Sequence, residues 1–185
     1  MIDEIKKDAE QRMQGAVDAL RRDLSSIRTG RASPALVERL TIDYYGTPTP
    51  LNQLAGVSAP EPRLLVIQPW DRGALPAIER AIQQSELGLT PNNDGQIIRL
   101  SIPQLTEERR KELVRQLRAK VEEGKVAVRN VRRDAMESVK DLLKEKKIGE
   151  DDERRAEAEI QELTNRFIEE ADAVGQAKEE EVLEV

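Results

Sequence analysis

Cysteine and histidine are both absent from the 185-residue sequence. Without cysteine the chain can form no disulfide, no thiolate zinc site and no cysteine nucleophile. Without histidine it lacks the commonest general base and the commonest transition-metal ligand. The sequence also contains no glycine-rich phosphate loop and no nucleophile elbow. We therefore expect no catalytic residue, no metal site and no cofactor, and we interpret the chain as a protein that is not an enzyme.

Aromatic residues and long apolar runs are scarce as well. Aromatic residues make up 2% of the sequence and charged residues 36%, a composition closer to that of long helices than to that of a compact globular core. No apolar run approaches the ~20 residues that a membrane span requires, and the first residues lack the basic and apolar regions of a signal peptide. We expect a cytoplasmic protein with no membrane partner.

The charge that is present is distributed unevenly. The net charge is -6, but residues 107–147 carry fourteen basic and nine acidic residues, whereas residues 148–185 carry four basic and fourteen acidic ones. At helical spacing, seven cations of the first segment project on one side: Lys111, Arg115, Arg118, Lys125, Arg129, Arg132 and Arg133. A sorted basic face favours an anionic partner, and the guanidinium fork of arginine suits phosphate geometry. The alternative is a solvated face with scattered ion pairs.

The acidic segment that follows has two interpretations. It could mimic nucleic acid or bind a basic partner, but we favour a solvated helix whose acids pair with the basic helix beside it. Asp151 and Asp152 come directly after Gly149, where acidic residues are ordinarily helix caps rather than metal ligands.

Three amphipathic helices are predicted, over 1–29, 106–147 and from 150 onward. Apolar residues recur in each at steps of three and four, which gives each helix one apolar stripe. The second stripe comprises Val114, Leu117, Val121, Val128, Val131, Ala135 and Leu142. Thr106 is the expected cap of that helix, and Gly124 on its stripe marks a bend or a close approach of helices. Burying the three stripes against one another predicts a three-helix bundle.

Residues 30–105 have a different character, because they hold most of the prolines, both tyrosines and the only tryptophan. Strands are predicted at 41–45, 63–68 and 96–102, a helix at 74–87 and a turn at 92–95. Ser33 before Pro34 predicts a cap and a short helix. We interpret Trp70 as a filler of a core or a hinge, with stacking on a nucleic-acid base as the alternative. The segment predicts a small α/β domain.

Together these patterns predict an α+β protein. Residues 1–29 and 106–185 form the three-helix bundle, and residues 30–105 form an inserted β/α/β domain. Two short connections, near 28–32 and 102–106, then lie side by side, an arrangement typical of a hinge. The hinge residues that we expect are Thr29, Gly30, Arg31, Pro103 and Thr106.

Several motifs in order carry a resemblance that spans the whole chain. They are the sequences of residues 28–34 (RTGRASP), 44–46 (YYG), 88–92 (GLTPN), 105–111 (LTEERRK) and 126–134 (VAVRNVRRD). In type, order and spacing they resemble the bacterial ribosome recycling factor family. The length of the chain and the acidic helix after Gly149 are similar to that family too.

The resemblance implies an L-shaped monomer that acts after translation termination. With elongation factor G and GTP, it would split the ribosome into subunits and release the messenger and tRNA, without hydrolysing anything itself. The bundle would lie on the ribosomal RNA of the large subunit. The motif match implies rRNA contacts for Arg129, Arg132 and Arg133. It implies them less directly for Arg110 and for Arg28 or Arg31, and the basic face adds Lys125 and Arg118 to the set.

Two other classes of function stay open on the residues alone. A coiled-coil scaffold or co-chaperone could use the same basic face to bind acidic protein surfaces, and binding to purified large subunits would separate the two. An enzyme on the α/β insert is disfavoured by the absence of histidine, cysteine and a phosphate loop.

Overall fold

The computed structural model describes residues 1–184, which divide into two compact units. The first comprises Met1–Leu24 and Glu112–Glu180, and the second comprises Ser25–Lys111 with the residues from Glu181 onward. The first unit is helical and the second holds every strand of the described chain. This mixture of long helices and a small sheet confirms the predicted α+β class. No helix among the described residues is long and apolar enough to cross a bilayer.

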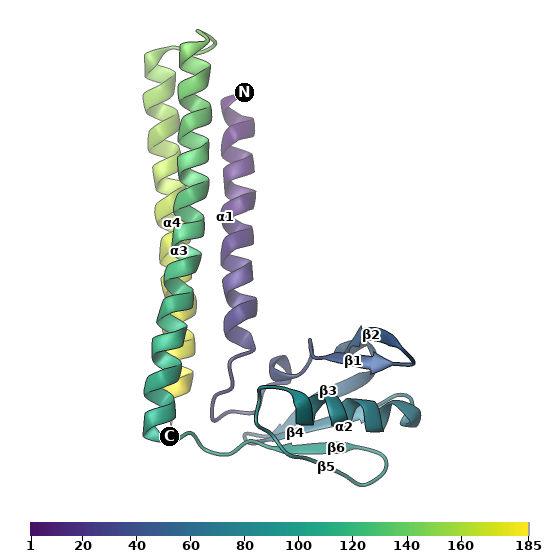
Figure 1. Ribbon diagram of the computed structural model, residues 1–185. Helices are drawn as coiled ribbons and strands as arrows, with labels where there is room; N and C mark the ends of the chain where they lie inside the picture. Colours follow the sequence, from purple (N-terminus) through teal and green to yellow (C-terminus); the bar gives the residue numbers. More distant parts are fainter. Residues whose placement is uncertain (185) are drawn as a thin grey trace. The chain divides into compact units, whose positions relative to one another are not determined.

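Three long helices, α1 (Ile2–Ser25), α3 (Glu107–Lys144) and α4 (Glu150–Leu183), run side by side in the first unit (Figure 1). Ala9, Met13 and Val17 repeat at steps of four on α1 and are buried, as a single apolar stripe predicts. Thr106 caps α3, since its hydroxyl accepts a hydrogen bond from the backbone N–H of Arg109 at 3.1 Å. Asp152 accepts one from the N–H of Gly149 at 3.2 Å, which supports its interpretation as a capping residue.

The helical predictions were wrong in two places. Helix α1 ends at Ser25 rather than at residue 29. Ser25 and Ser26 lie at this end, and serine is a residue type that helix interiors disfavour. The stripe of α3 is also displaced at both ends. Leu113 and Val139 are buried there, whereas the predicted Val114 and Leu142 are only half-buried.

Gly124 marks a close approach of helices and not the end of one. A Cβ built on Gly124 would lie 3.2 Å from Cδ2 of the buried Leu20 of α1. Gly175 of α4 is tighter still, because a Cβ there would lie 2.6 Å from Cγ2 of Val121 on α3. Glycine at these two positions lets the three helices pack closely.

The second unit is built on a four-stranded antiparallel sheet with strand order β3-β4-β6-β5. Its strands are β3 (Ala55–Glu61), β4 (Leu64–Pro69), β5 (Pro91–Asn93) and β6 (Ile98–Ser101). A separate hairpin pairs β1 (Thr41–Tyr44) with β2 (Thr47–Pro50), and α2 (Leu75–Gln84) completes the unit. Ile42, Leu65, Ile67, Ile78 and Ile98 are fully buried in its core. Three short helical turns lie between these elements: η1 (Pro34–Leu36), η2 (Leu51–Gln53) and η3 (Arg72–Ala74).

Ser33 is the N-cap of the 3-10 turn η1 and Pro34 is its first residue, as predicted, although the Ser33 side chain makes no capping hydrogen bond. One local prediction in this unit was wrong. Trp70 is 69% exposed and fills neither a core nor a hinge. It follows β4, in which Leu65, Ile67 and Pro69 are buried, so strand alternation turns Trp70 outward.

Candidate nucleic-acid interface

The cations of α3 fall into two groups according to their partners. Arg118 bonds to Glu179 of α4 at 2.6 Å, and Lys125 bonds to Asp172 of α4 at 2.9 Å. These hydrogen bonds raise the pKa of both cations. The Lys125 side chain is only 16% exposed. Both residues belonged to the predicted rRNA-binding set, but their charges are engaged within the bundle.

Arg129 and Arg133 form the second group. Both are exposed, and neither side chain has a hydrogen-bond or ion-pair partner among residues 1–184. They are four residues apart on α3, so their side chains are neighbours on one face. Two like charges at this spacing destabilise a helix by roughly 0.2–0.5 kcal/mol unless an anion lies between them. Arg115, Lys140 and Lys144 of α3 are also exposed and have no such partner among residues 1–184. What distinguishes Arg129 and Arg133 is that, together with Arg132, they place three arginines within five residues of the predicted basic face.

Arg132 lies between the two groups. It is half-buried, and its Nη1 donates a hydrogen bond to Oε1 of Gln161 on α4 at 3.0 Å. Because glutamine is neutral, this contact orients the guanidinium without neutralising it. Arg132 therefore keeps its full charge beside Arg129 and Arg133.

Several acidic residues of α4 pair with cations of the other two helices. Besides Glu179 and Asp172, Glu159 pairs with Lys6 of α1, and Glu170 pairs with Arg21 of α1 at 2.9 Å. These contacts confirm the interpretation of α4 as an acidic helix that pairs within the bundle. They also explain why α3 keeps only part of its basic face available to a partner.

The remaining predicted site residues lie in the second unit. Arg110 lines a cavity of about 210 Å³ together with Gly30, Arg31, Arg63 and Glu184. Among the described residues, the side chains of Arg110 and Arg63 have no hydrogen-bond or ion-pair partner. Arg110 thus belongs to a different unit from Arg129, Arg132 and Arg133.

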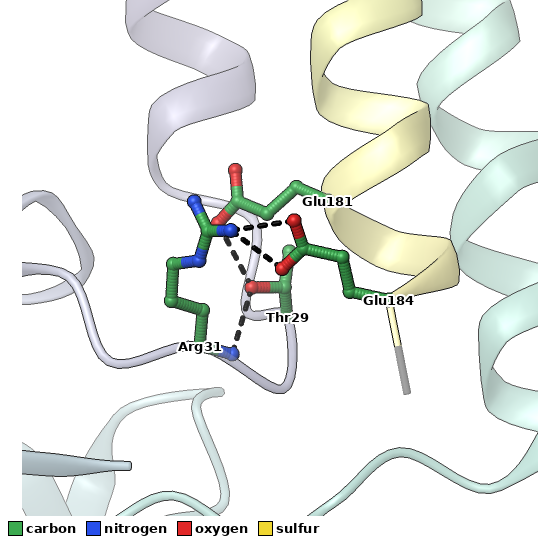
Figure 2. A network of polar contacts seen from close by, with 4 residues as sticks. All are labelled: Thr29, Arg31, Glu181 and Glu184. Carbon is green, nitrogen blue, oxygen red and sulfur yellow. Dashed lines mark hydrogen bonds and ion pairs between the residues drawn. The ribbon is translucent and has the colours of Figure 1, made fainter. Parts of the chain in front are cut away.

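A polar network holds two of the predicted hinge residues (Figure 2). The buried Thr29 hydroxyl donates to Oε1 of Glu181 at 3.0 Å and accepts the backbone N–H of Arg31 at 3.1 Å. Arg31 Nη2 contacts both carboxylate oxygens of Glu184 at 2.5 Å. Glu181 and Glu184 were not predicted from the sequence. No pattern near residue 30 indicates hydrogen-bond partners that lie about 150 residues away in the chain.

Arg28 precedes this network and has an unusual environment. Its Nη1 is buried with no hydrogen-bond partner among residues 1–184. Burial, followed by the nearby charge of Arg109, lowers the pKa of Arg28. Elsewhere, no group of three or more acidic residues in the described chain could hold a metal ion.

The model of one protein family, described as "Ribosome recycling factor", matches residues 20–183. The chain belongs to the ribosome recycling factor family. It is 60% identical over 185 residues to the ribosome-recycling factor of Thermomicrobium roseum and 58% identical over 185 residues to that of Heliobacterium modesticaldum. In both comparisons the alignment covers 100% of each chain.

Solved structures of this family share the fold. A solution structure of the ribosome recycling factor is 45% identical, with a TM-score of 0.80 over 100% of this chain and 98% of that one. A second structure, at 49% identity, has a TM-score of 0.72 and covers 100% of both chains. It comes from models of the T. thermophilus ribosome recycling factor and the E. coli elongation factor G bound to the E. coli post-termination complex. The chain is thus a translation factor whose family acts in ribosome recycling.

Proposed function

We propose that this chain binds ribosomal RNA of the large subunit through Arg129, Arg132 and Arg133. With elongation factor G and GTP, it splits the post-termination ribosome into subunits and releases the messenger and tRNA. It acts in the cytoplasm as a monomer and catalyses no covalent step. The observation that carries the proposal is the availability of Arg129 and Arg133 on a helix where Arg118 and Lys125 are paired.

The physical argument rests on phosphate chemistry. A guanidinium can donate two parallel hydrogen bonds to a phosphate, and such charge-assisted bonds are about twice as strong as neutral ones. Arg129 and Arg133 are adjacent on one helical face, and Arg132 is oriented beside them by Gln161. Three guanidinium groups on neighbouring positions of one helix can contact phosphates of the same RNA segment. An acidic protein surface would match them less well, since its carboxylates are not held at a regular spacing.

We also propose that the two domains, 1–29 with 106–185 and 30–105, turn about a hinge. Thr29, Gly30, Arg31, Pro103 and Thr106 supply its backbone. A GTPase that pushes on one domain would change the angle, and the rigid bundle would carry the force to the intersubunit contacts. Support comes from the two short connections on either side of the inserted segment.

Binding to purified large subunits tests the RNA contact. Arg129→Ala and Arg133→Ala should each weaken binding by about 1–3 kcal/mol, the range for a charge-assisted phosphate contact. Each should also reduce the slope of log affinity against log salt, by about 0.7–0.9 for every phosphate that the variant no longer neutralises. Arg118→Ala should have a smaller effect, because Arg118 is already paired with Glu179.

Arg155→Ala is the matched control. Arg155 of α4 is exposed and its side chain has no partner among residues 1–184, so the substitution removes one charge without touching the proposed site. If Arg155→Ala weakens binding as much as Arg129→Ala, net charge alone drives association and the site assignment fails. In a splitting assay with elongation factor G and GTP, a rate of subunit separation that is the same with and without the chain would overturn the recycling function.

A further inference from the structure

The open face of the four-stranded sheet presents the only tryptophan of the chain. On β4 the side chains of Leu65, Ile67 and Pro69 are buried, whereas Gln68 is exposed. Alternation places Trp70 on the same face as Gln68, and its side chain is 69% exposed. A tryptophan left in water exposes a large apolar ring at a cost that burial would recover. Its ring is therefore available to stack on a flat ligand.

The strand beside Gln68 leaves room for a flat ligand. Gly56 of β3 is the register partner of Gln68. A Cβ built on Gly56 would have no heavy atom within 4 Å, and the φ angle of Gly56 is not positive. Glycine is thus not required there by the backbone or by a close neighbour. We call the surface formed by Gly56, Gln68 and Trp70 the aromatic shelf.

Two residues near Trp70 in the sequence, Asp71 and Arg72, are charged. Asp71, the next residue, is held by its own loop: Oδ1 accepts the N–H of Gly73 at 2.9 Å, and Oδ2 accepts the Tyr44 hydroxyl at 2.8 Å. The hydrogen bond from Gly73 and that from Tyr44 lower the pKa of Asp71. Arg72, by contrast, is exposed, and its side chain has no hydrogen-bond or ion-pair partner among residues 1–184.

We propose that the aromatic shelf binds an unpaired nucleotide of RNA. The base stacks on the Trp70 ring over the open space at Gly56, the Gln68 amide bonds to the edge of the base, and Arg72 contacts the phosphate. An exposed aromatic ring on an open antiparallel sheet, with an amide and an arginine beside it, is a chemistry that recognises single-stranded RNA. This inference does not rest on the proposed rRNA contact, because that contact uses different residues on α3.

A protein partner fits the aromatic shelf less well. Protein interfaces concentrate their energy in an apolar centre that is sealed from water by its surroundings. The neighbours of Trp70 on this face are instead mostly polar or lack a side chain, namely Gln68, Ser58 and Gly56, with the half-buried Val66 as the partner of Ser58. One aromatic ring with polar groups around it suits a nucleic-acid base. The face of the base stacks on the ring, and its edge forms hydrogen bonds with the polar groups.

The single tryptophan makes the test direct, since all tryptophan fluorescence of the full chain comes from Trp70. A six-nucleotide unpaired oligouridine or oligoadenosine should quench this fluorescence in a saturable way. A base-paired hairpin of the same length and an abasic ribose-phosphate oligomer should not. Gly56→Leu, which fills the shelf while leaving Trp70 in place, should weaken binding of the unpaired oligomer about tenfold, which is the effect of removing one stacked base.

Two controls separate the aromatic shelf from other causes. Gln84→Leu, at an exposed position on α2, should leave the affinity unchanged, and both leucine variants should melt like the unmodified chain. The Arg129→Ala/Arg133→Ala variant should quench as the unmodified chain does, so failure of one proposal is distinguishable from failure of the other. Equal quenching by the abasic oligomer, or no effect of Gly56→Leu, overturns the inference. If elongation factor G quenches the Trp70 fluorescence and the unpaired oligomers do not, the surface docks a protein, and this result also overturns the inference.

Discussion

Three glycines inside the long helices provide a graded test of how the bundle packs. Each can be replaced by alanine, and each replacement gains roughly 1 kcal/mol of intrinsic helix propensity. What differs is the space around the new methyl group. Gly15 of α1 has no heavy atom within 4 Å of an added Cβ, Gly124 has Leu20 Cδ2 at 3.2 Å, and Gly175 has Val121 Cγ2 at 2.6 Å.

The expected free energies of unfolding follow from these distances. Gly15→Ala should stabilise the bundle by about 1 kcal/mol, because the added methyl group contacts no other atom and the full gain in helix propensity remains. Gly124→Ala should be nearly neutral, since the end of Leu20 can yield a few tenths of an ångström but is itself fully buried. Gly175→Ala should destabilise by up to about 2 kcal/mol net, because overpacking costs about 1–3 kcal/mol, the propensity gain offsets about 1 kcal/mol of it, and valine in a helix is confined to one rotamer.

Urea unfolding followed by far-ultraviolet circular dichroism measures this series, since most of the helical signal comes from the bundle. Val121→Ala in the same experiment removes the atom that blocks Gly175. In that background Gly175→Ala should lose most of its cost, so the two changes should couple favourably in a double-mutant cycle. If Gly175→Ala stabilises as much as Gly15→Ala, or if the two changes at 121 and 175 are additive, the close packing of α3 on α4 is refuted.

Two further predictions concern single polar contacts. The raised pKa of Lys125 means that its ion pair with Asp172 contributes stability below the ordinary lysine pKa of about 10.4, and that this contribution disappears as pH rises through the higher folded value. The stability difference between the chain and its Lys125→Met variant should therefore shrink above that pH in urea titrations; a constant difference would exclude the ion pair as the cause. Thr29→Val keeps the shape of a buried side chain but leaves the Arg31 N–H without its acceptor, so we expect about 1–2 kcal/mol of destabilisation. The urea midpoint of the second unit, followed by Trp70 fluorescence, measures this loss. Thr47→Val makes the same substitution at an exposed position and is the control, so it should leave the midpoint unchanged.

The helical part was largely predictable because helical periodicity is local. Steps of three and four place Leu117, Val121 and Val128 on one stripe whatever lies opposite, and all three are buried. The ends were less predictable, since the choice between Val114 and Leu113 depends on the supercoil of the neighbouring helices. Among the strands, β2, β3 and β5 were missed because Pro48, Pro60, Gly56 and Pro91 are residues that strands disfavour, and part of β5 lies where we predicted a turn at 92–95. All three are edge strands, where proline and glycine are tolerated.

The candidate site divides in the same way. The spacing of the cations along α3 decides which of them share one face of the helix, so the basic face could be predicted from the sequence. Which of those cations is available is decided by α4, because Glu179 and Asp172 come from a segment more than 45 residues away. Exposure of Trp70 likewise depends on which face of β4 meets the core.

The sequence alone determined four features of this protein. They are the absence of cysteine and histidine chemistry, the three amphipathic helices, the separation of basic from acidic residues, and the family. Each of these depends on residue type and short-range spacing, which a chain carries in any conformation. Only the tertiary structure decided that Arg118 and Lys125 are paired while Arg129 and Arg133 are available, that Gly124 and Gly175 are contact points, and that Gly56 opens a space beside Gln68 near Trp70. These features depend on distances between segments far apart in the chain, which spacing along the sequence does not encode.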